Sequence, residues 1–109
     1  MTATLELRNT LRQMVAVLQE ERQALAGMDL DSIMGCATDK AALCDAFEGL
    51  DRDAIDAECY GLLDAARRLN EVNRQVRNLI AANVASRLDA LTGSPALYRA
   101  APAYAYAAR

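Results

Sequence analysis

The side chains that most often carry out catalysis are missing or scattered in this chain of 109 residues. It has no histidine, which removes the commonest general base and a frequent metal ligand. Carboxylates do occur close together, as in Asp53 with Asp56 and in Glu20 with Glu21, but such pairs are ordinary on exposed helix faces and at helix starts. Neither GxxxxGK[ST] nor GxGxxG occurs. The residue types therefore predict a protein that is not an enzyme and that holds no cofactor and no metal.

The three cysteines, Cys36, Cys44 and Cys59, contain no CxxC pair. No apolar stretch approaches the roughly 20 residues that cross a bilayer, and no basic segment precedes an apolar run at the N-terminus. We therefore expect a cytoplasmic protein without membrane insertion. In that compartment the thiols should stay reduced and pack as small apolar groups rather than serve redox or metal chemistry.

Charge is distributed unevenly along the chain. Residues 1–64 carry 13 acidic and 5 basic side chains, whereas residues 65–109 carry 2 acidic and 7 basic ones. Such asymmetry indicates either a polyanionic partner or an acidic half that folds back on a basic half, and we favour the second. The chain has a single lysine, an acidic pI of about 4.8, and arginines spread around its last helix. Nucleic-acid binding is therefore not expected.

The composition favours helices throughout. Aromatic residues are scarce, whereas Ala, Leu, Arg, Glu and Gln are abundant, and no run with a period of two indicates a strand. Apolar spacing predicts three helices over about 5–26, 32–50 and 53–91. The expected fold class is all-α: an antiparallel three-helix bundle or coiled coil in residues 1–93, with a long C-terminal helix and a flexible tail over 94–109.

Particular residues are expected to bound and pack these helices. Gly27 should end the first helix, Asp31 should cap the start of the second, and Asp51 or Asp53 should cap the third. Apolar residues of the first helix alternate at spacings of four and three, which is the heptad seam of helices packed side by side. The seam comprises Leu7, Leu11, Met14, Leu18, Leu25 and Met28, with Glu21 in its one gap. The predicted buried face of the second helix comprises Ile33, Cys36, Ala37, Leu43, Cys44, Phe47 and Leu50.

Helix lengths suggest where a partner binds. At about 1.5 Å per residue the third helix is roughly 58 Å long, but the first two are only about 30–33 Å long. They would cover about half of it and leave its last part without a partner inside the chain. Burying one large apolar side chain contributes roughly 1.5–3 kcal/mol, so an uncovered row of them predicts a binding surface. The row comprises Val76, Leu79, Ile80, Val84, Leu88 and Leu91.

Three occupants of that surface remain open. It could bind an amphipathic helix of another protein, it could pair with a second copy in a homodimer, or the first two helices could slide along and cover it.

Several local patterns resemble those of one protein family. Leu18-Gln19-Glu20-Glu21 leads to Ala24-Leu25, Asp29-Leu30 and Lys40-Ala41-Ala42-Leu43; an Asn-x-x-Asn pattern, Asn70 and Asn73, precedes Leu79-Ile80; and Leu97-Tyr98 follows the last helix. Over about residues 5–99 this layout resembles FlgN, the flagellar type III export chaperone of the hook-associated proteins. The family tends to have a Tyr-Gly pair after the helix, whereas Arg99 follows Tyr98 here.

The resemblance implies a function that agrees with the length argument. FlgN-type chaperones bind the C-terminal helical segments of the hook-associated proteins FlgK and FlgL and dock on the export gate protein FlhA. Carried across, Tyr98 would contact the export gate. The substrate surface would comprise Asn73, Val76, Leu79, Ile80, Val84 and Leu88. Asn70 and Asn73 could instead be solvated or hydrogen-bonded between helices. The alternative functions are a self-associating structural coiled coil and a helical adaptor for another client.

Overall fold

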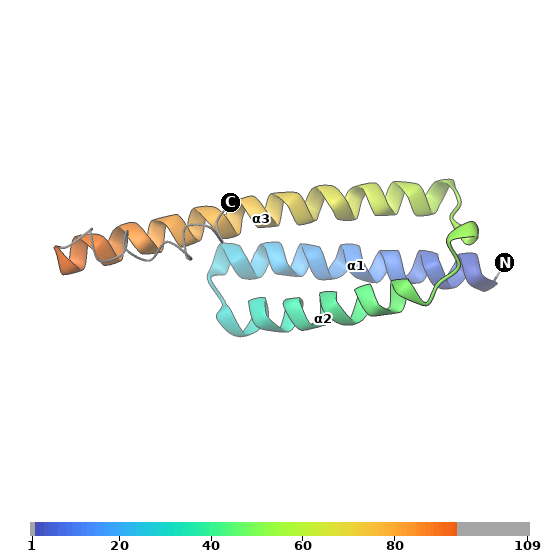
Figure 1. Cartoon of the computed structure of the whole chain (residues 1–109), viewed down its shortest axis with the longest axis horizontal. Helices are drawn as coiled ribbons and strands as arrows, with labels where there is room; N and C mark the ends of the chain where they lie inside the picture. Colours follow the sequence, from blue (N-terminus) through green and yellow to red (C-terminus); the bar gives the residue numbers. More distant parts are fainter. Residues whose placement is uncertain (1, 94–109) are drawn as a thin grey trace. The chain divides into compact units, whose positions relative to one another are not determined.

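The computed structural model describes residues 2–93, which form α-helices with one short 3-10 turn and no strand (Figure 1). The elements are α1 (Thr2–Gly27), α2 (Leu30–Glu48), η1 (Arg52–Ala54) and α3 (Ala57–Thr92). The all-α bundle expected from the apolar spacing is confirmed. The tail predicted over 94–109, and with it Tyr98, lies outside the described residues. None of the helices in the described part is long and apolar enough to cross a membrane.

The start of α2 is capped by Asp29 and not, as predicted, by Asp31. The Asp29 carboxylate accepts the backbone N–H of Ser32 at 3.2 Å and the Ser32 hydroxyl at 2.7 Å. These bonds satisfy one of the free donors of the first helical turn and hold the pKa of Asp29 below its usual range. Asp31 instead lies within the first turn, where its charge faces the positive end of the helix dipole.

The start of α3 also differs from the prediction. Asp51 caps η1, where it accepts the N–H of Asp53 at 2.9 Å, and α3 begins only at Ala57. The cap of α3 is Asp56, which accepts the N–H of Cys59 at 2.9 Å. Assigning Asp51 or Asp53 as the cap was wrong because three aspartates lie close together and η1 uses the first of them.

The residue that follows α1 has a left-handed backbone conformation. Gly27, predicted to lie just past the helix, is its last residue, and the positive φ of 54° belongs to Met28. The N–H of Met28 donates to the Leu25 carbonyl at 3.1 Å, and that of Asp29 donates to the Ala24 carbonyl at 2.9 Å. This pair of bonds is the Schellman motif, which usually places glycine where Met28 lies.

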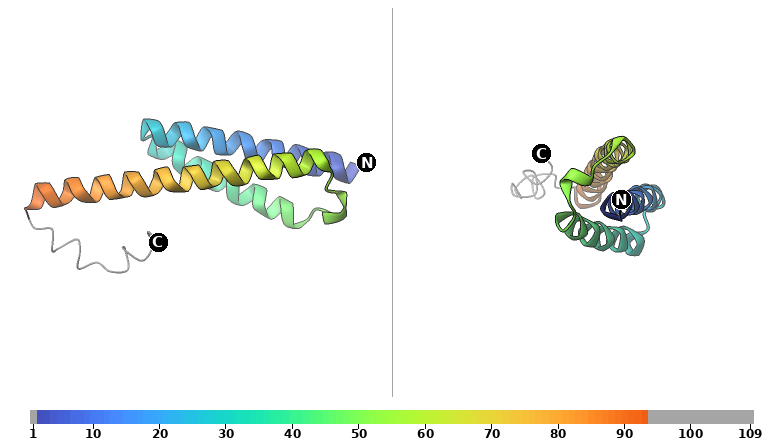
Figure 2. Two further views of the ribbon diagram at one scale, coloured as in Figure 1. Left: turned by 90° about the horizontal axis from the view of Figure 1, so that it is seen from above. Right: turned by 90° about the vertical axis from the view of Figure 1, so that its right-hand side faces the viewer.

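Contacts divide the chain after Asn73, and residues 2–73 form one compact unit. An end-on view shows α1, α2 and the first part of α3 at the corners of a triangle (Figure 2). The seam of α1 supplies most of the core and confirms the predicted heptad pattern except at Met28, which is 61% exposed. The buried members are Leu7, Leu11, Met14, Leu18, Glu21 and Leu25.

The buried face of α2 is narrower than predicted. Cys36 is buried, whereas Ala37 and Cys44 are exposed, so the prediction was wrong for these two. The remaining members, Ile33, Leu43, Phe47 and Leu50, are half-buried. All three cysteines are free thiols, and burial raises the pKa of Cys36. Only part of the α2 surface is therefore used inside the unit.

Candidate protein-binding surface

The second part of α3, from Arg74 to Thr92, exposes several large apolar side chains. Leu79 is 70% exposed, Val84 41%, Leu88 39% and Leu91 83%, whereas Val76 and Ile80 are half-buried. Large side chains at such exposures are the main feature of this segment that calls for a functional explanation.

Most of these side chains lie on one face of the helix. At about 100° per residue, five of them fall within an arc of roughly 120°, and Leu79 lies about 60° outside it. We name these five residues the apolar stripe: Val76, Ile80, Val84, Leu88 and Leu91. The same arc contains the residues of α3 that pack in the first unit, namely Cys59, Leu62, Ala66, Leu69 and Asn73. The face that packs in the first unit therefore continues as an exposed apolar face in the second.

Asn73 is not part of an accessible surface, in contrast to its predicted place at the edge of the substrate site. Its side chain is fully buried, and its Nδ2 donates to the Leu18 carbonyl oxygen and to the Glu21 carboxylate, both at 2.9 Å. The alternative, a hydrogen bond between helices of the bundle, is what the structure shows. Its heptad position on α3 was the sequence signal for burial.

Asn73 belongs to a buried cluster with one side chain from each helix. Lys40 of α2 reaches the Glu21 carboxylate of α1 at 2.9 Å and lies 3.5 Å from the Asn70 side-chain oxygen. The Glu21 side chain is 3% exposed and that of Lys40 is 20% exposed. We name Glu21, Lys40 and Asn73 the polar node. Because a buried charge needs its partners in place, the node favours one register of the three helices.

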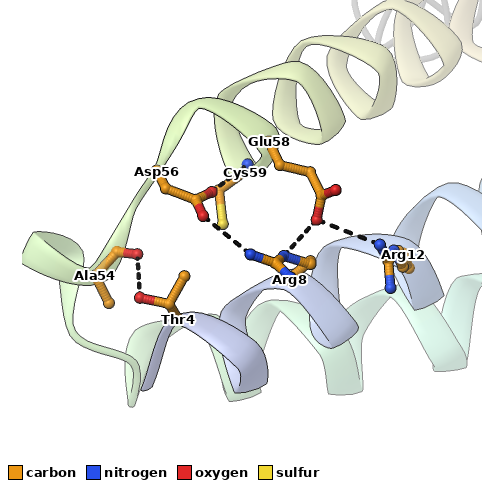
Figure 3. A network of polar contacts seen from close by, with 7 residues as sticks. All are labelled: Thr4, Arg8, Arg12, Ala54, Asp56, Glu58 and Cys59. Carbon is orange, nitrogen blue, oxygen red and sulfur yellow. Dashed lines mark hydrogen bonds and ion pairs between the residues drawn. The ribbon is translucent and has the colours of Figure 1, made fainter. Parts of the chain in front are cut away.

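A second set of polar contacts ties α1 to the start of α3 (Figure 3). The Arg8 guanidinium donates to Asp56 at 3.0 Å and pairs with Glu58, and Arg12 pairs with Glu58 at 3.2 Å. These ion pairs, like the Lys40–Glu21 pair of the polar node, join residues of the acidic stretch 1–64 to one another. Three of the five basic side chains of that stretch, Arg8, Arg12 and Lys40, thus connect its own helices.

Asp56 is the most perturbed carboxyl in this network. The backbone N–H and the thiol of Cys59, followed by Arg8, lower its pKa to about 2. A carboxylate held ionised by a cap and a guanidinium suits a structural role better than proton transfer. No group of three or more potential metal ligands occurs among residues 2–93.

The first unit also contains an apolar groove between α2 and α3, with α1 as its floor. Two cavities of about 360 and 420 Å³ adjoin there and share Leu11, Phe47 and Leu63. We name this feature the bundle groove. Its floor is formed by Leu7, Leu11, Met14 and Leu18, and Lys40, Arg67 and Asn70 line one end. The sequence patterns gave no signal of it, since it arises from the spacing of α2 and α3 around α1.

Comparisons of this chain with protein-family models, curated proteins and solved structures find no match. The fold and the exposed stripe define a small helical-bundle protein with an apolar helix face. A function has to be argued from that face.

Proposed function

We propose that this protein is an export chaperone of the FlgN type. Its apolar stripe would bind an amphipathic helix at the C-terminus of a hook-associated protein of the FlgK or FlgL kind and deliver that client to the export gate protein FlhA. The observation that carries the binding mode is the exposure of Val84, Leu88 and Leu91 along one face of α3. The identity of the client rests on the sequence resemblance.

The stripe has the properties that helix recognition requires. Its members recur at spacings of four and three, so they can interdigitate with the same spacing on a partner helix. A client helix with one apolar face would bury both faces together, and each large side chain so buried contributes roughly 1.5–3 kcal/mol before the cost of association. The stripe contains no buried ion pair to select a single partner, which suits two related clients.

A double substitution within the stripe tests client binding. Val84→Asp with Leu88→Asp places two charges where the client would pack, and we expect at least a 100-fold weaker affinity for a FlgK or FlgL C-terminal segment. The matched control is Ala82→Asp with Ser86→Asp, two exposed residues at the same spacing on the opposite side of α3. Isothermal titration measures both. Unchanged affinity in the stripe variant, with an intact circular-dichroism spectrum, would refute the assignment.

The gate contact is tested separately. Deleting residues 94–109, which include Tyr98, should leave client binding unchanged and weaken docking to the cytoplasmic domain of FlhA. A Tyr98→Ala variant should reproduce most of the loss if that residue makes the contact. If both variants bind FlhA as the full chain does, the tail has no role in docking.

A pull-down from cytosol distinguishes the export chaperone from an adaptor for another client. Recovery of hook-associated proteins by the full chain, but not by the stripe variant, supports the proposal. If the full chain instead recovers a different helical protein, the proposed binding mode stands but the client is not a hook-associated protein.

A further inference from the structure

A second face of α2, within the first unit, has an apolar pattern that the bundle leaves uncovered. Exposed residues recur along it at spacings of four and three, which is the heptad spacing of helices that pack side by side. Leu30 is 66% exposed and Met34 is 60% exposed. At about 100° per residue, five such residues fall within an arc of roughly 80°. We name them the outer face of α2: Leu30, Met34, Ala37, Ala41 and Cys44.

The outer face is distinct from the face by which α2 joins the bundle. An inner series, which is buried or half-buried, also recurs at spacings of three and four, and it packs on the core residues of α1. A helix with two such series has apolar surface for neighbours on two sides. Ala37 and Cys44, which apolar spacing assigned to the buried face, belong to the unused series. The inner series comprises Ile33, Cys36, Lys40, Leu43 and Phe47.

The edge of the outer face that lies away from the inner series is acidic. Asp31 and Asp45 lie along this edge, and Glu48 lies at the C-terminal end of the face. None of the ion pairs within residues 2–93 involves these three carboxylates. The one basic residue of α2, Lys40, lies in the inner series and pairs with Glu21. The outer face therefore combines an exposed apolar row with carboxylates that have no cation beside them.

We propose that the outer face of α2 binds a basic amphipathic helix of a partner protein. Lysine or arginine residues beside the apolar row of that helix would face Asp31 and Asp45, while the row itself packs on Met34 and its neighbours. The small side chains of Ala37 and Ala41 let the partner helix approach closely and leave space for its large apolar residues. This contact goes beyond the proposed function and does not involve the stripe that binds the client.

Charge and shape both disfavour a second copy of the chain as the occupant. Two outer faces packed antiparallel would bring Asp31 of one copy near Asp45 of the other, and like charges placed together repel. Two outer faces packed parallel would place alanine against alanine at the two central layers, where little apolar area is then buried. A basic helix with large apolar residues avoids both costs.

Two designed peptides serve as the partner helix in the test. The first has about three heptads with leucine at the two apolar positions and lysine at the flanking positions, and the second has glutamate in place of each lysine. Fluorescence anisotropy with a trace of labelled peptide measures binding to the full chain. We expect a Kd below about 100 μM for the lysine peptide and at least 10-fold weaker binding of the glutamate peptide. A chain that binds neither peptide, or both equally, would overturn the proposal.

Charge reversal locates the binding site. Asp31→Lys with Asp45→Lys should weaken binding of the lysine peptide at least 10-fold and strengthen binding of the glutamate peptide. The matched control is Glu20→Lys with Asp39→Lys, which changes the net charge equally at two exposed residues outside the outer face and should change either affinity less than about 3-fold. Circular dichroism confirms that both variants are folded. Equal effects of the two pairs would mean that the peptide responds only to the overall charge of the first unit.

Substitutions in the apolar rows distinguish the possible occupants and sites. Met34→Asp should weaken binding of the lysine peptide at least 10-fold, whereas Ala42→Asp, at an exposed residue on another side of α2, should not. Val84→Asp with Leu88→Asp should leave this affinity unchanged, and loss of the peptide in that variant would place it on the stripe instead. If the wild type sediments as a dimer that Met34→Asp dissociates, a second copy covers the outer face and the proposal is wrong.

The reactivity of Cys44 gives a readout in the unmodified chain. Cys44 is the exposed thiol, since Cys36 and Cys59 are buried. A saturating amount of the lysine peptide should slow modification of Cys44 by a thiol reagent at least 10-fold, because the bound helix lies over it. An unchanged rate at saturation would show that the peptide binds elsewhere. Client binding by the stripe can succeed or fail independently of these results.

Discussion

The two parts of α3 share one helical face and differ in what that face contacts. Before the boundary after Asn73, Cys59 is 0% exposed and Ala66 6% exposed. Beyond it, on the same face, Leu88 is 39% and Leu91 83% exposed. The apolar period is the same in both parts. Periodicity therefore identifies the apolar face of a helix, but not whether the chain itself or another molecule covers it.

The two parts also differ in how they would specify a partner. The first is tied to α1 and α2 through the polar node, which favours one arrangement because the Glu21 carboxylate is buried beside Lys40. The stripe has only apolar side chains, whose packing depends on shape and is reversible. This difference is compatible with the proposed function, in which the stripe holds a client and later releases it.

The largest expected effect comes from the same truncation made in both parts. Leu18→Ala removes a core side chain that is 1% exposed and should lower the free energy of unfolding by about 2–5 kcal/mol. Leu88→Ala should change it by no more than about 0.5 kcal/mol in dilute solution. Urea unfolding measures both. A large cost for Leu88→Ala at every protein concentration would show that the stripe is already buried within one chain.

The polar node should produce the next largest effect. Lys40→Met removes the ammonium group that lies 2.9 Å from the buried Glu21 carboxylate and should lower the free energy of unfolding by about 3 kcal/mol. Adding Glu21→Leu to Lys40→Met should restore much of the loss, since the buried carboxylate charge is then removed as well. Chemical unfolding of the two single variants and the double variant gives the coupling energy. Additive losses would mean that the ion pair does not fix the bundle.

The fold was largely predictable from sequence because the spacing of apolar residues within each helix determines which of its faces is buried. The seam of α1 follows from apolar spacing alone, and the end of α1 at Gly27 lies one residue after the predicted end. The helix starts were not predictable, because several aspartates cluster near each one and hydrogen-bond geometry decides between them. Ala37 and Cys44 were misplaced because the extent to which α1 covers α2 is a tertiary property.

The candidate site was predictable only in part. The spacing of the stripe identified its apolar face, but the burial of Asn73 depends on Leu18 and Glu21, which lie far away in sequence. The bundle groove could not be foreseen, since no single element contains it. Its existence depends on the distance between two helices that both pack on a third.

The network at the start of α3 should make the first unit sensitive to acid. The folded-state pKa of Asp56, about 2, lies below its ordinary value of 3.8, so ionised Asp56 stabilises the fold above about pH 4. This contribution is lost as the pH falls from 3.8 toward 2. Asp56→Asn keeps a capping oxygen but loses the charge that faces Arg8.

We therefore expect Asp56→Asn to be less stable than the wild type at pH 7 and to approach it near pH 2. Urea unfolding at several pH values measures the difference. Asp64→Asn is the control, since Asp64 forms an exposed pair with Arg68 one turn away and should change stability little at any pH. A pH-independent gap for Asp56→Asn would show that the charge of Asp56 does not contribute.

The smallest effect compares the two helix ends that use a left-handed residue. Met28 has a φ of 54° at the end of α1, and Gly93 has a φ of 65° after α3. Met28→Gly relieves the strain of a side chain in that region and should raise the free energy of unfolding by about 0.5–1 kcal/mol, which thermal unfolding detects as a higher Tm. Gly93→Ala introduces similar strain, but the last turn of α3 can unravel instead, so Tm should not change. If Gly93→Ala lowered Tm as much as Met28→Gly raises it, the end of α3 would unfold together with the bundle. The second part of α3 would then contribute to the stability of the fold as the first part does.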